Sequence, residues 1–480
     1  MELLFIFTFL LLASLIGLFT KKRLFIEFVS VFASIFALFG SINVAMKVVA
    51  LGSYSPFSFL YVESFGAVLL LIISLIGLST TVYSIQYLRQ ESAKNIIGPA
   101  RVRQYFVLLN LFILFMFLAT TVNSPIFSWI FIEATTLSTV FLISFYNKSS
   151  SVEAAWKYLV VNSVGLLFGF FGTLLYFTSL HSVDNGSIVS WNGLLNGATS
   201  LDPVIAKIAF IFVLIGYGAK VGLAPMHTWK PDAYSKAPTP LGALFSGALL
   251  PVAFVTILKF KTITDTVVGL SFSQNLLILF GTLSVFISAF IIFSSRNYKR
   301  LLAYSGIENA GIMALGFGFG GLGIFAGTLH MIYHSLIKSA LFFCSGNFLL
   351  KYGSAKIKNI RGAINVLPFT SVVFVVGFLA LIGMPPFGVF FTKLTILSAG
   401  IKNHQLFSIV LIFLVSLLFI GFLKHVTAMV FGKKPEDMSI KKESVWLIIP
   451  PLVLIGVVIC LSFYIPPFLY TLFNNIVLHY

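Results

Sequence analysis

Long runs of apolar residues alternate with short charged or turn-rich breaks along most of the chain. A helix needs about 20 apolar residues to cross the hydrocarbon core of a bilayer. Marking such runs between the breaks predicts fourteen membrane-spanning helices. They cover residues 3–20, 25–45, 64–86, 104–121, 126–146, 158–179, 204–226, 239–258, 274–294, 301–320, 322–349, 367–398, 406–430 and 445–472. The pattern therefore predicts an all-α integral membrane protein.

The composition supports this fold class. Of the 480 residues, 59% are hydrophobic and 9% are charged, whereas about 25% of the residues of a soluble domain are charged. A soluble enzyme is therefore excluded. Residues 1–20 resemble a signal peptide in length, but Glu2 stands where basic residues are usual, and the run is followed by Lys21-Lys22-Arg23. We interpret this run as the first membrane helix, with its N-terminus outside.

Basic residues are distributed unevenly over the predicted loops. The chain has 31 Lys and Arg against 14 Asp and Glu, a net charge of +17. With the N-terminus outside, 22 basic residues fall in inside loops and four (Lys47, Lys259, Lys261 and Lys402) in outside loops. A missed or extra helix would reverse every later loop, so the split supports fourteen spans with both termini outside. It also indicates contact with anionic lipid headgroups, not nucleic acid.

Among the ionisable residues within the predicted spans, two acids and two lysines are the first candidates. They are Glu133, Lys220, Glu308 and Lys393. An ionisable side chain at membrane depth costs a few kcal/mol or more, so it normally faces the protein interior and often lines an ion route. A buried lysine is moreover driven toward its neutral form, while a nearby carboxylate favours its charged form. We therefore expect these acids to control proton affinity at the lysines.

The predicted eleventh helix carries three further ionisable residues on one face. His330, His334 and Lys338 are spaced i, i+4, i+8. A neutral imidazole both accepts and donates a proton near physiological pH, which favours a proton relay. The same i, i+4 spacing occurs in zinc sites, but no Cys or carboxylate lies next to the two histidines. A hydrogen bond that only packs helices together is the other alternative.

Glycine and proline interrupt the two spans that carry a central lysine. GYGAKVGLAP surrounds Lys220, and GMPPFG precedes Lys393. Paired broken helices in corresponding halves indicate an ion site in an inverted-repeat transporter, although a simple kink is the alternative. The seventh and twelfth spans are five apart, and the same offset pairs the helix of Glu133 with that of Glu308. We expect Lys220 to superpose on Lys393, and Glu133 to lie near Glu308, when one half is inverted.

This offset predicts the domain organisation. Residues 104–258 and 274–430 would form two inverted five-helix repeats, containing spans 4–8 and 9–13. An N-terminal segment of three helices, residues 1–103, would precede them, and a C-terminal loop and last helix, residues 431–480, would follow. The longest outside segment, about 180–203, lacks Lys, Arg and any strand pattern, so we expect a surface loop there.

Several of these segments match one known family. The sequence resembles the antiporter-like subunits of respiratory complex I and their relatives in membrane-bound [NiFe] hydrogenases and multisubunit cation/proton antiporters. The motifs WIFIEATTL, AAWKYL, KVGLAPMHTWKPDAYSKAPTPLGALFSG, KRLLAYSGIENAGIMALG, LHMIYHSLIKSALFFCSGN and GMPPFGVFFTK carry the resemblance across about residues 104 to 430. The amino acids in these motifs are most similar to those of the component F type of formate hydrogenlyase and hydrogenase-4 complexes.

The resemblance implies roles for individual residues. Glu133 corresponds to the fifth-helix glutamate, Lys220 to the lysine of the broken seventh helix, and Lys393 to the exit residue of the twelfth helix. The eleventh-helix relay corresponds to His330, His334 and Lys338. Glu308 rests mainly on the repeat argument.

Other positions are secondary candidates or depart from the family pattern. Ser246 stands at the eighth-helix position that is often His or Lys, and Lys230 replaces the Leu of a TWLPDA motif. Glu63 stands in place of a more common Asp, and His227 precedes Lys230 in the same motif. Lys157 follows Glu153 and is either a loop cation or, in a longer sixth helix, a membrane group.

These residues favour proton translocation by a membrane subunit of a redox-driven complex. The competing functions are a cation (Na⁺)/H⁺ antiporter subunit without redox chemistry and a structural scaffold, which the set of buried charges argues against. The chain contains no haem, Rossmann or Walker motif and only two cysteines, Cys344 and Cys460, so we expect it to hold no cofactor or metal and not to be catalytic alone. The resemblance implies other membrane subunits as partners and, through them, iron-sulfur and [NiFe] hydrogenase subunits, in a prokaryotic inner membrane.

Overall fold

The computed structural model describes residues 1–179, 190–435, 438 and 443–480. The first half contains a short hairpin and the following helices: α1 (Glu2–Phe19), α2 (Arg23–Leu51), β1 (Tyr54–Phe57), β2 (Leu60–Val62), α3 (Ser64–Ala93), α4 (Pro99–Thr121), α5 (Pro125–Ile143), α6 (Ser149–Thr178), α7 (Trp191–Asn196), η1 (Ala198–Ser200), α8 (Pro203–Val221) and α9 (Trp229–Lys236). The eighth predicted span consists of α10 (Thr239–Leu244), the π-helical turn η2 (Phe245–Leu249) and α11 (Leu250–Val268).

The second half is also helical in all its named elements. They are α12 (Leu270–Ser294), α13 (Tyr298–Phe319), α14 (Leu322–Tyr352), η3 (Ile357–Asn359), α15 (Ala363–Val366), α16 (Pro368–Ile382), α17 (Gly388–Asn403), α18 (Gln405–Val430), α19 (Val445–Phe463) and α20 (Pro467–His479). Proline at the first turn begins α4, α5, α8, α16 and α20, where its missing N–H costs no helical hydrogen bond.

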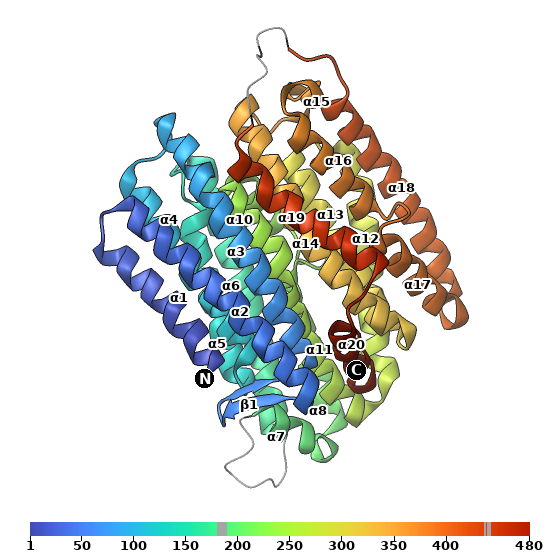
Figure 1. The fold of residues 1–480 in the computed structure, drawn as a ribbon. Coiled ribbons are helices and arrows are strands. Elements are labelled where there is room, and N and C mark those ends of the chain that lie inside the picture. The colour runs from blue at the N-terminus through green and yellow to red at the C-terminus, as the bar shows by residue number, and fades with distance from the viewer. Residues whose placement is uncertain (180–189, 436–437, 439–442) are drawn as a thin grey trace.

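The long helices lie side by side in one bundle, with α1 and α2 on one flank and α17 and α18 on the other (Figure 1). The N- and C-termini lie at the same end of this bundle, together with β1 and α7. The stretch formed by α10, η2 and α11 lies in the interior of the bundle, because all residues of its most apolar 18-residue segment are buried. Helices at the periphery expose large apolar side chains such as Phe28, Phe141 and Leu167, which suits contact with lipid.

The all-α membrane fold predicted from the sequence is confirmed. Within the described residues, 11 helices are long and apolar enough to cross a membrane. The other predicted spans coincide with α13, α14 and the broken pair α16–α17, which carry more polar residues or are interrupted. The number of fourteen spans and the division into two inverted repeats stay predictions.

The structure differs from the predicted elements in three places. The antiparallel hairpin β1–β2 was not expected, since its strands have only four and three residues. The last predicted span, 445–472, is two helices, because α19 ends at Phe463 and a Pro466-Pro467 pair begins α20. The expected loop at 180–203 lies partly outside the described residues, and its remainder contains α7 and η1.

Candidate functional site

Helix α8 ends directly after Lys220 and positions this side chain in the bundle. The carboxylate of Asp202 caps the N-terminus of α8, and Gly222 ends the helix in the left-handed conformation, with φ of 81°. The lysine is 1% exposed. Its Nζ donates hydrogen bonds to the Thr136 hydroxyl at 2.7 Å and to the Tyr158 hydroxyl at 3.0 Å. At the end of the broken helix, the lysine is therefore hydrogen-bonded to two neutral hydroxyl groups.

The carboxylate of Glu133, on α5, reaches the same group of residues without touching the lysine. Its Oε1 accepts a hydrogen bond from the Ser163 hydroxyl at 2.6 Å. Its Oε2 lies 3.2 Å from the Thr136 hydroxyl, which itself accepts from Lys220. Glu133 is half-buried. The acid and the lysine of the first half are thus joined through one threonine hydroxyl.

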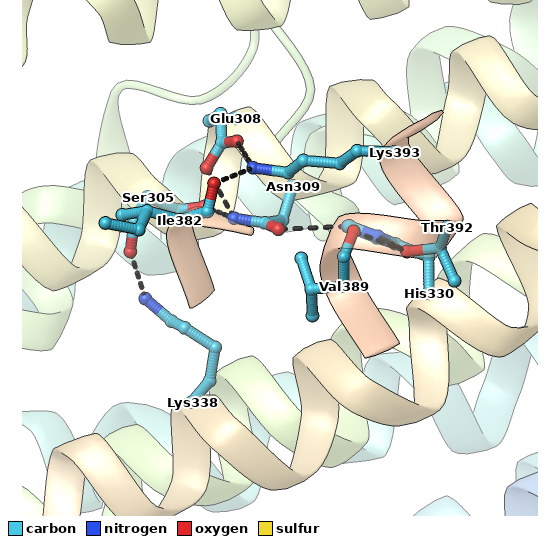
Figure 2. A network of polar contacts seen from close by, with 9 residues as sticks. All are labelled: Ser305, Glu308, Asn309, His330, Lys338, Ile382, Val389, Thr392 and Lys393. Carbon is cyan, nitrogen blue, oxygen red and sulfur yellow. Dashed lines mark hydrogen bonds and ion pairs between the residues drawn. The ribbon is translucent and has the colours of Figure 1, made fainter. Parts of the chain in front are cut away.

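The second half holds its acid and lysine in direct contact. Lys393, on α17 beyond the break at Gly383, places its Nζ 2.9 Å from the Oε1 of Glu308 on α13 (Figure 2). The glutamate and the lysine are 1% and 7% exposed, respectively. The Lys393 ammonium also lies 3.4 Å from the carbonyl oxygen of Ile382, the last residue of α16. Here a carboxylate and a helix C-terminus both stabilise the lysine charge.

An asparagine extends this ion pair to the first histidine of α14. Asn309 donates to the Oε2 of Glu308 at 2.5 Å, and its Oδ1 lies 2.9 Å from the Nε2 of His330. The other ring nitrogen of His330 lies 2.9 Å from the Thr392 hydroxyl, next to Lys393. Figure 2 shows this continuous polar path across α13, α14 and α17. Asn309 and Thr392 were not among the residues predicted from the sequence.

The three predicted relay residues of α14 are all completely buried but do not hydrogen-bond to one another. Lys338 donates to the Leu302 carbonyl and, at 2.6 Å, to the Ser305 hydroxyl, both on α13. Neither ring nitrogen of His334 has a hydrogen-bond partner in the part of the chain that the structure describes. The structure therefore places the relay residues on a shared buried face, in contact with α13 and α17.

The secondary candidates occupy two different environments. Lys230 is completely buried, and its Nζ donates to the Val221 carbonyl at 2.9 Å. His227 is 8% exposed and packs edge-on against the ring of Tyr304. Both lie in the connection between α8 and α10, close to the broken end of α8.

The other two secondary candidates lie near the ends of helices. Lys157 is half-exposed on α6 and pairs with Glu153 at 2.6 Å and, more distantly, with Asp232 at 3.5 Å. Its environment is that of a loop cation, although α6 begins at Ser149 and is longer than predicted. Glu63 precedes α3 and pairs with Lys259 at 3.3 Å, and it accepts a hydrogen bond from the Tyr480 hydroxyl at 3.1 Å.

The described residues offer no group of three or more His, Cys, Asp and Glu side chains that could hold a metal ion. Both ring nitrogens of His330 are already engaged by Asn309 and Thr392. What the arrangement provides is a series of proton donors and acceptors inside a helical bundle. Groups of this kind donate and accept protons, and none of them carries electrons.

Comparison with known proteins connects this arrangement to a family. The family described as NADH:quinone oxidoreductase/Mrp antiporter, TM, matches residues 122–419. The hydrogenase-4 component F homolog of Methylacidiphilum infernorum is 38% identical over 354 residues, which cover 73% of this chain and 74% of that protein. Hydrogenase-4 component B of Escherichia coli is 26% identical over 70% of this chain and 51% of its own length, so the chain matches only about half of that relative.

Solved structures show the same fold. The membrane-bound sulfane sulfur reductase, an archaeal respiratory membrane complex, contains a chain that superposes with a TM-score of 0.87 at 22% identity, covering 99% of this chain and 97% of that one. A chain of the Mrp complex from Dietzia sp. DQ12-45-1b superposes with a TM-score of 0.86 at 20% identity, covering 99% and 96%. At these identities the likeness concerns the fold.

Proposed function

The chain belongs to the NADH:quinone oxidoreductase/Mrp antiporter transmembrane family, and on this basis we propose that it translocates protons as a membrane subunit of a redox-driven complex. Its relatives are components of hydrogenase-4 and subunits of NADH-quinone oxidoreductase. We propose partner subunits of the same kind, namely membrane subunits and, through them, iron-sulfur and [NiFe] hydrogenase subunits. The host would be a prokaryotic inner membrane, with both termini of this chain outside.

One observation carries the proposal. Within the family-matched region, buried polar side chains connect an acid with a lysine in each half: Glu133 through Thr136 to Lys220, and Glu308 directly to Lys393. A change of charge or position at either acid alters the proton affinity of its lysine. In this way a conformational or electrostatic signal from a partner subunit is converted into proton uptake and release. The chain would need no cofactor of its own.

The test is to isolate the native complex through a tag on this chain and identify the subunits that copurify. Proteoliposomes of the complex are then given the donor that these subunits oxidise, hydrogen for a [NiFe] subunit or NADH for a flavin subunit. We expect acidification of the lumen that stops with electron transfer. Redox turnover without any proton movement contradicts the proposal.

A cation/proton antiporter subunit is the second candidate, supported by the same family description and by the fold shared with the Mrp complex. It is distinguished by the driving force. Without an electron donor, an imposed Na⁺ gradient would move protons in proteoliposomes of an antiporter, while a redox-driven pump would stay silent.

A further inference from the structure

Lys230 is completely buried in the bundle, in a slot that encloses its side chain. The lysine is on α9, directly after the break that follows α8, and its side chain is 0% exposed. A side chain on Gly222 would put its Cβ 2.7 Å from the Lys230 Cδ, so the glycine makes room for the lysine stem. Gly306 on α13 lies at the tip of the slot, where an added Cβ would be in ordinary contact with the Lys230 Nζ, at 3.5 Å. Gly222 therefore leaves space for this lysine, and α13 borders its amine.

The Lys230 ammonium has no carboxylate partner in the described chain. The nearest acid in sequence, Asp232, pairs instead with Lys157 and Arg300. Within the part of the chain that the structure describes, the amine makes one hydrogen bond, to the Val221 carbonyl at 2.9 Å. Taking an ammonium out of water without a counter-charge disfavours its charged form, so a buried amine in this position binds its proton less tightly than a surface lysine does.

The slot borders groups of both halves of the candidate pathway. On the side of the first half, the Tyr158 hydroxyl accepts from Lys220, and its ring packs against Trp229, the residue before Lys230. Gly306, at the tip of the slot, is the neighbour of Ser305, whose hydroxyl accepts from Lys338. The charge of Lys230 also acts electrostatically on both Lys338 and His334. Lys230 is thus adjacent to the relay of α14 and is separated from Lys220 by the aromatic residues Tyr158 and Trp229.

Two buried polar groups beside the slot have no partner in the described residues. They are the hydroxyl of Ser246 and the ring of His334. A Cβ added to Gly306 would lie 3.3 Å from the Ser246 Oγ and 3.5 Å from the Lys230 Nζ. The hydroxyl and the amine therefore both border the space beside Gly306. Ser246 also sits in the π-helical turn η2, a form of helix that often marks functional positions.

We propose that Lys230 is a proton carrier that connects the first half of the chain with the relay on α14. This role rests on the proposed function, which supplies the proton current. The neutral amine of Lys230 takes up a proton that the Lys220 ammonium releases through the Tyr158 hydroxyl, to which Lys220 donates. One N–H bond forms at Lys230 while another breaks at Lys220. Release to Lys338 returns the amine to its neutral form, and no electrons are transferred.

A purely structural role is the alternative. The Val221 carbonyl belongs to the last turn of α8, and the amine of Lys230 caps it. A cap needs a hydrogen-bond donor but no exchangeable charge. Variants that keep the donor and remove the ionisable group separate the two roles.

The experiment uses the native complex in proteoliposomes, with proton uptake measured per electron transferred. Lys230→Met removes both the donor and the proton carrier while keeping the length of the stem. Lys230→Gln keeps an N–H donor that is not ionisable. We expect both variants to assemble, to keep electron transfer, and to lose proton uptake at least tenfold. Wild-type uptake in Lys230→Gln assigns the lysine to the cap and overturns the proposal.

A relocated carrier gives a second, independent readout. In Lys230→Met/Ser246→His, an imidazole takes the neighbouring position, and we expect uptake to recover to at least a third of the wild-type ratio. The recovered activity should also decline at lower pH than in the wild type, because an imidazole loses its proton at lower pH than an amine. The titratable groups that face this space, His227, Tyr234, His334 and Lys338, are the same in both proteins. Recovery with an unchanged pH profile overturns the proposal.

Lys220→Met serves as the control for the proposed function itself. If the wild-type complex takes up no protons, or if Lys220→Met pumps normally, the proposed function fails. If Lys220→Met abolishes uptake and Lys230→Met does not, the proposed function stands and the role of Lys230 fails.

Discussion

Removing the charge of Glu308 is expected to destabilise the chain far more than removing the charge of Glu133. The Glu308 carboxylate lies 2.9 Å from the Lys393 ammonium, and both side chains are buried. At an effective dielectric constant of about 20, two unit charges at this distance attract each other by ~6 kcal/mol. Most of this attraction offsets the cost of taking both charges out of water. Breaking such a pair from one side typically costs about 3–5 kcal/mol, because one buried charge is left uncompensated.

The structure leaves little to replace the carboxylate in Glu308→Gln. Among the described residues, the Lys393 ammonium has one other hydrogen-bond acceptor, the Ile382 carbonyl at 3.4 Å. Glu133, by contrast, is half-buried and hydrogen-bonds to the Thr136 and Ser163 hydroxyl groups, so Glu133→Gln keeps an acceptor oxygen for them and breaks no direct ion pair. We expect Glu133→Gln to cost no more than about 1 kcal/mol, the usual worth of a neutral hydrogen bond.

A double-mutant cycle measures the difference. The variants Glu308→Gln, Lys393→Met and the double variant are purified in the native complex, and the temperature at which this subunit is lost on heating is recorded. Each single variant should lower that temperature, and the double variant should recover most of the loss, because no unpaired charge remains buried. All three should fail to pump. If the double variant lowers that temperature by as much as the two single variants together, the ion-pair reasoning is refuted. It is also refuted if Glu133→Gln and Glu308→Gln lower the temperature equally.

Three further expectations concern other residues. Glu133→Gln should leave the subunit assembled but depress proton uptake per electron severalfold. Thr136→Val, which removes the hydroxyl between Glu133 and Lys220, should do the same. Normal uptake in both variants would mean that Glu133 does not act on Lys220. Lys220→Met should abolish uptake, and Lys220→Arg should fail as well, since arginine holds its proton at any accessible pH; an active Arg variant would mean that fixed charge is sufficient. Glu27→Ala should lower the free energy of unfolding of the subunit by about 1–3 kcal/mol without changing the proton-to-electron ratio. The reason is that this carboxylate, 3% exposed, pairs with Arg23 and Arg89 at one end of the bundle. A changed ratio at normal stability would place Glu27 on the proton path.

The hydrophobic pattern predicted the helices well, because a segment that crosses a membrane must be apolar and must satisfy its own backbone hydrogen bonds. The same argument explains why Lys220 and Lys393 could be found by eye, since a lysine inside an apolar run is rare. The residues that join them could not be found in this way. Asn309 and Thr392 are uncharged side chains of a kind common in membrane helices, and their importance depends on distances between α13, α14 and α17. Asn309 follows Glu308 directly, which is the one signal that pointed to it.

The sequence also could not reveal that Lys230 is buried. Lys230 belongs to a Trp-Lys-Pro-Asp sequence in a predicted inside loop, where a surface lysine is the usual expectation. Asp232 and Lys236 of the same segment are also charged. The difference arises from the packing of α9 against α13, which encloses Lys230 between Gly222 and Gly306, two residues that lie 84 positions apart in the sequence. Spacing along the chain carries no information about such a contact.

The unequal pairing of the two lysines bears on the direction of proton movement in the proposed function. Lys220 rests on two hydroxyl groups, so a modest change at Glu133 or at a neighbouring lysine shifts the balance between its charged and neutral forms. Lys393 is held by a direct carboxylate contact, so its proton leaves only when that contact is lengthened or Glu308 is itself neutralised. His330 reaches Glu308 through Asn309, and a proton arriving along α14 therefore meets the acid that holds the last lysine. The half with the weaker pairing suits proton loading, and the half with the ion pair suits a release step that waits for an incoming charge.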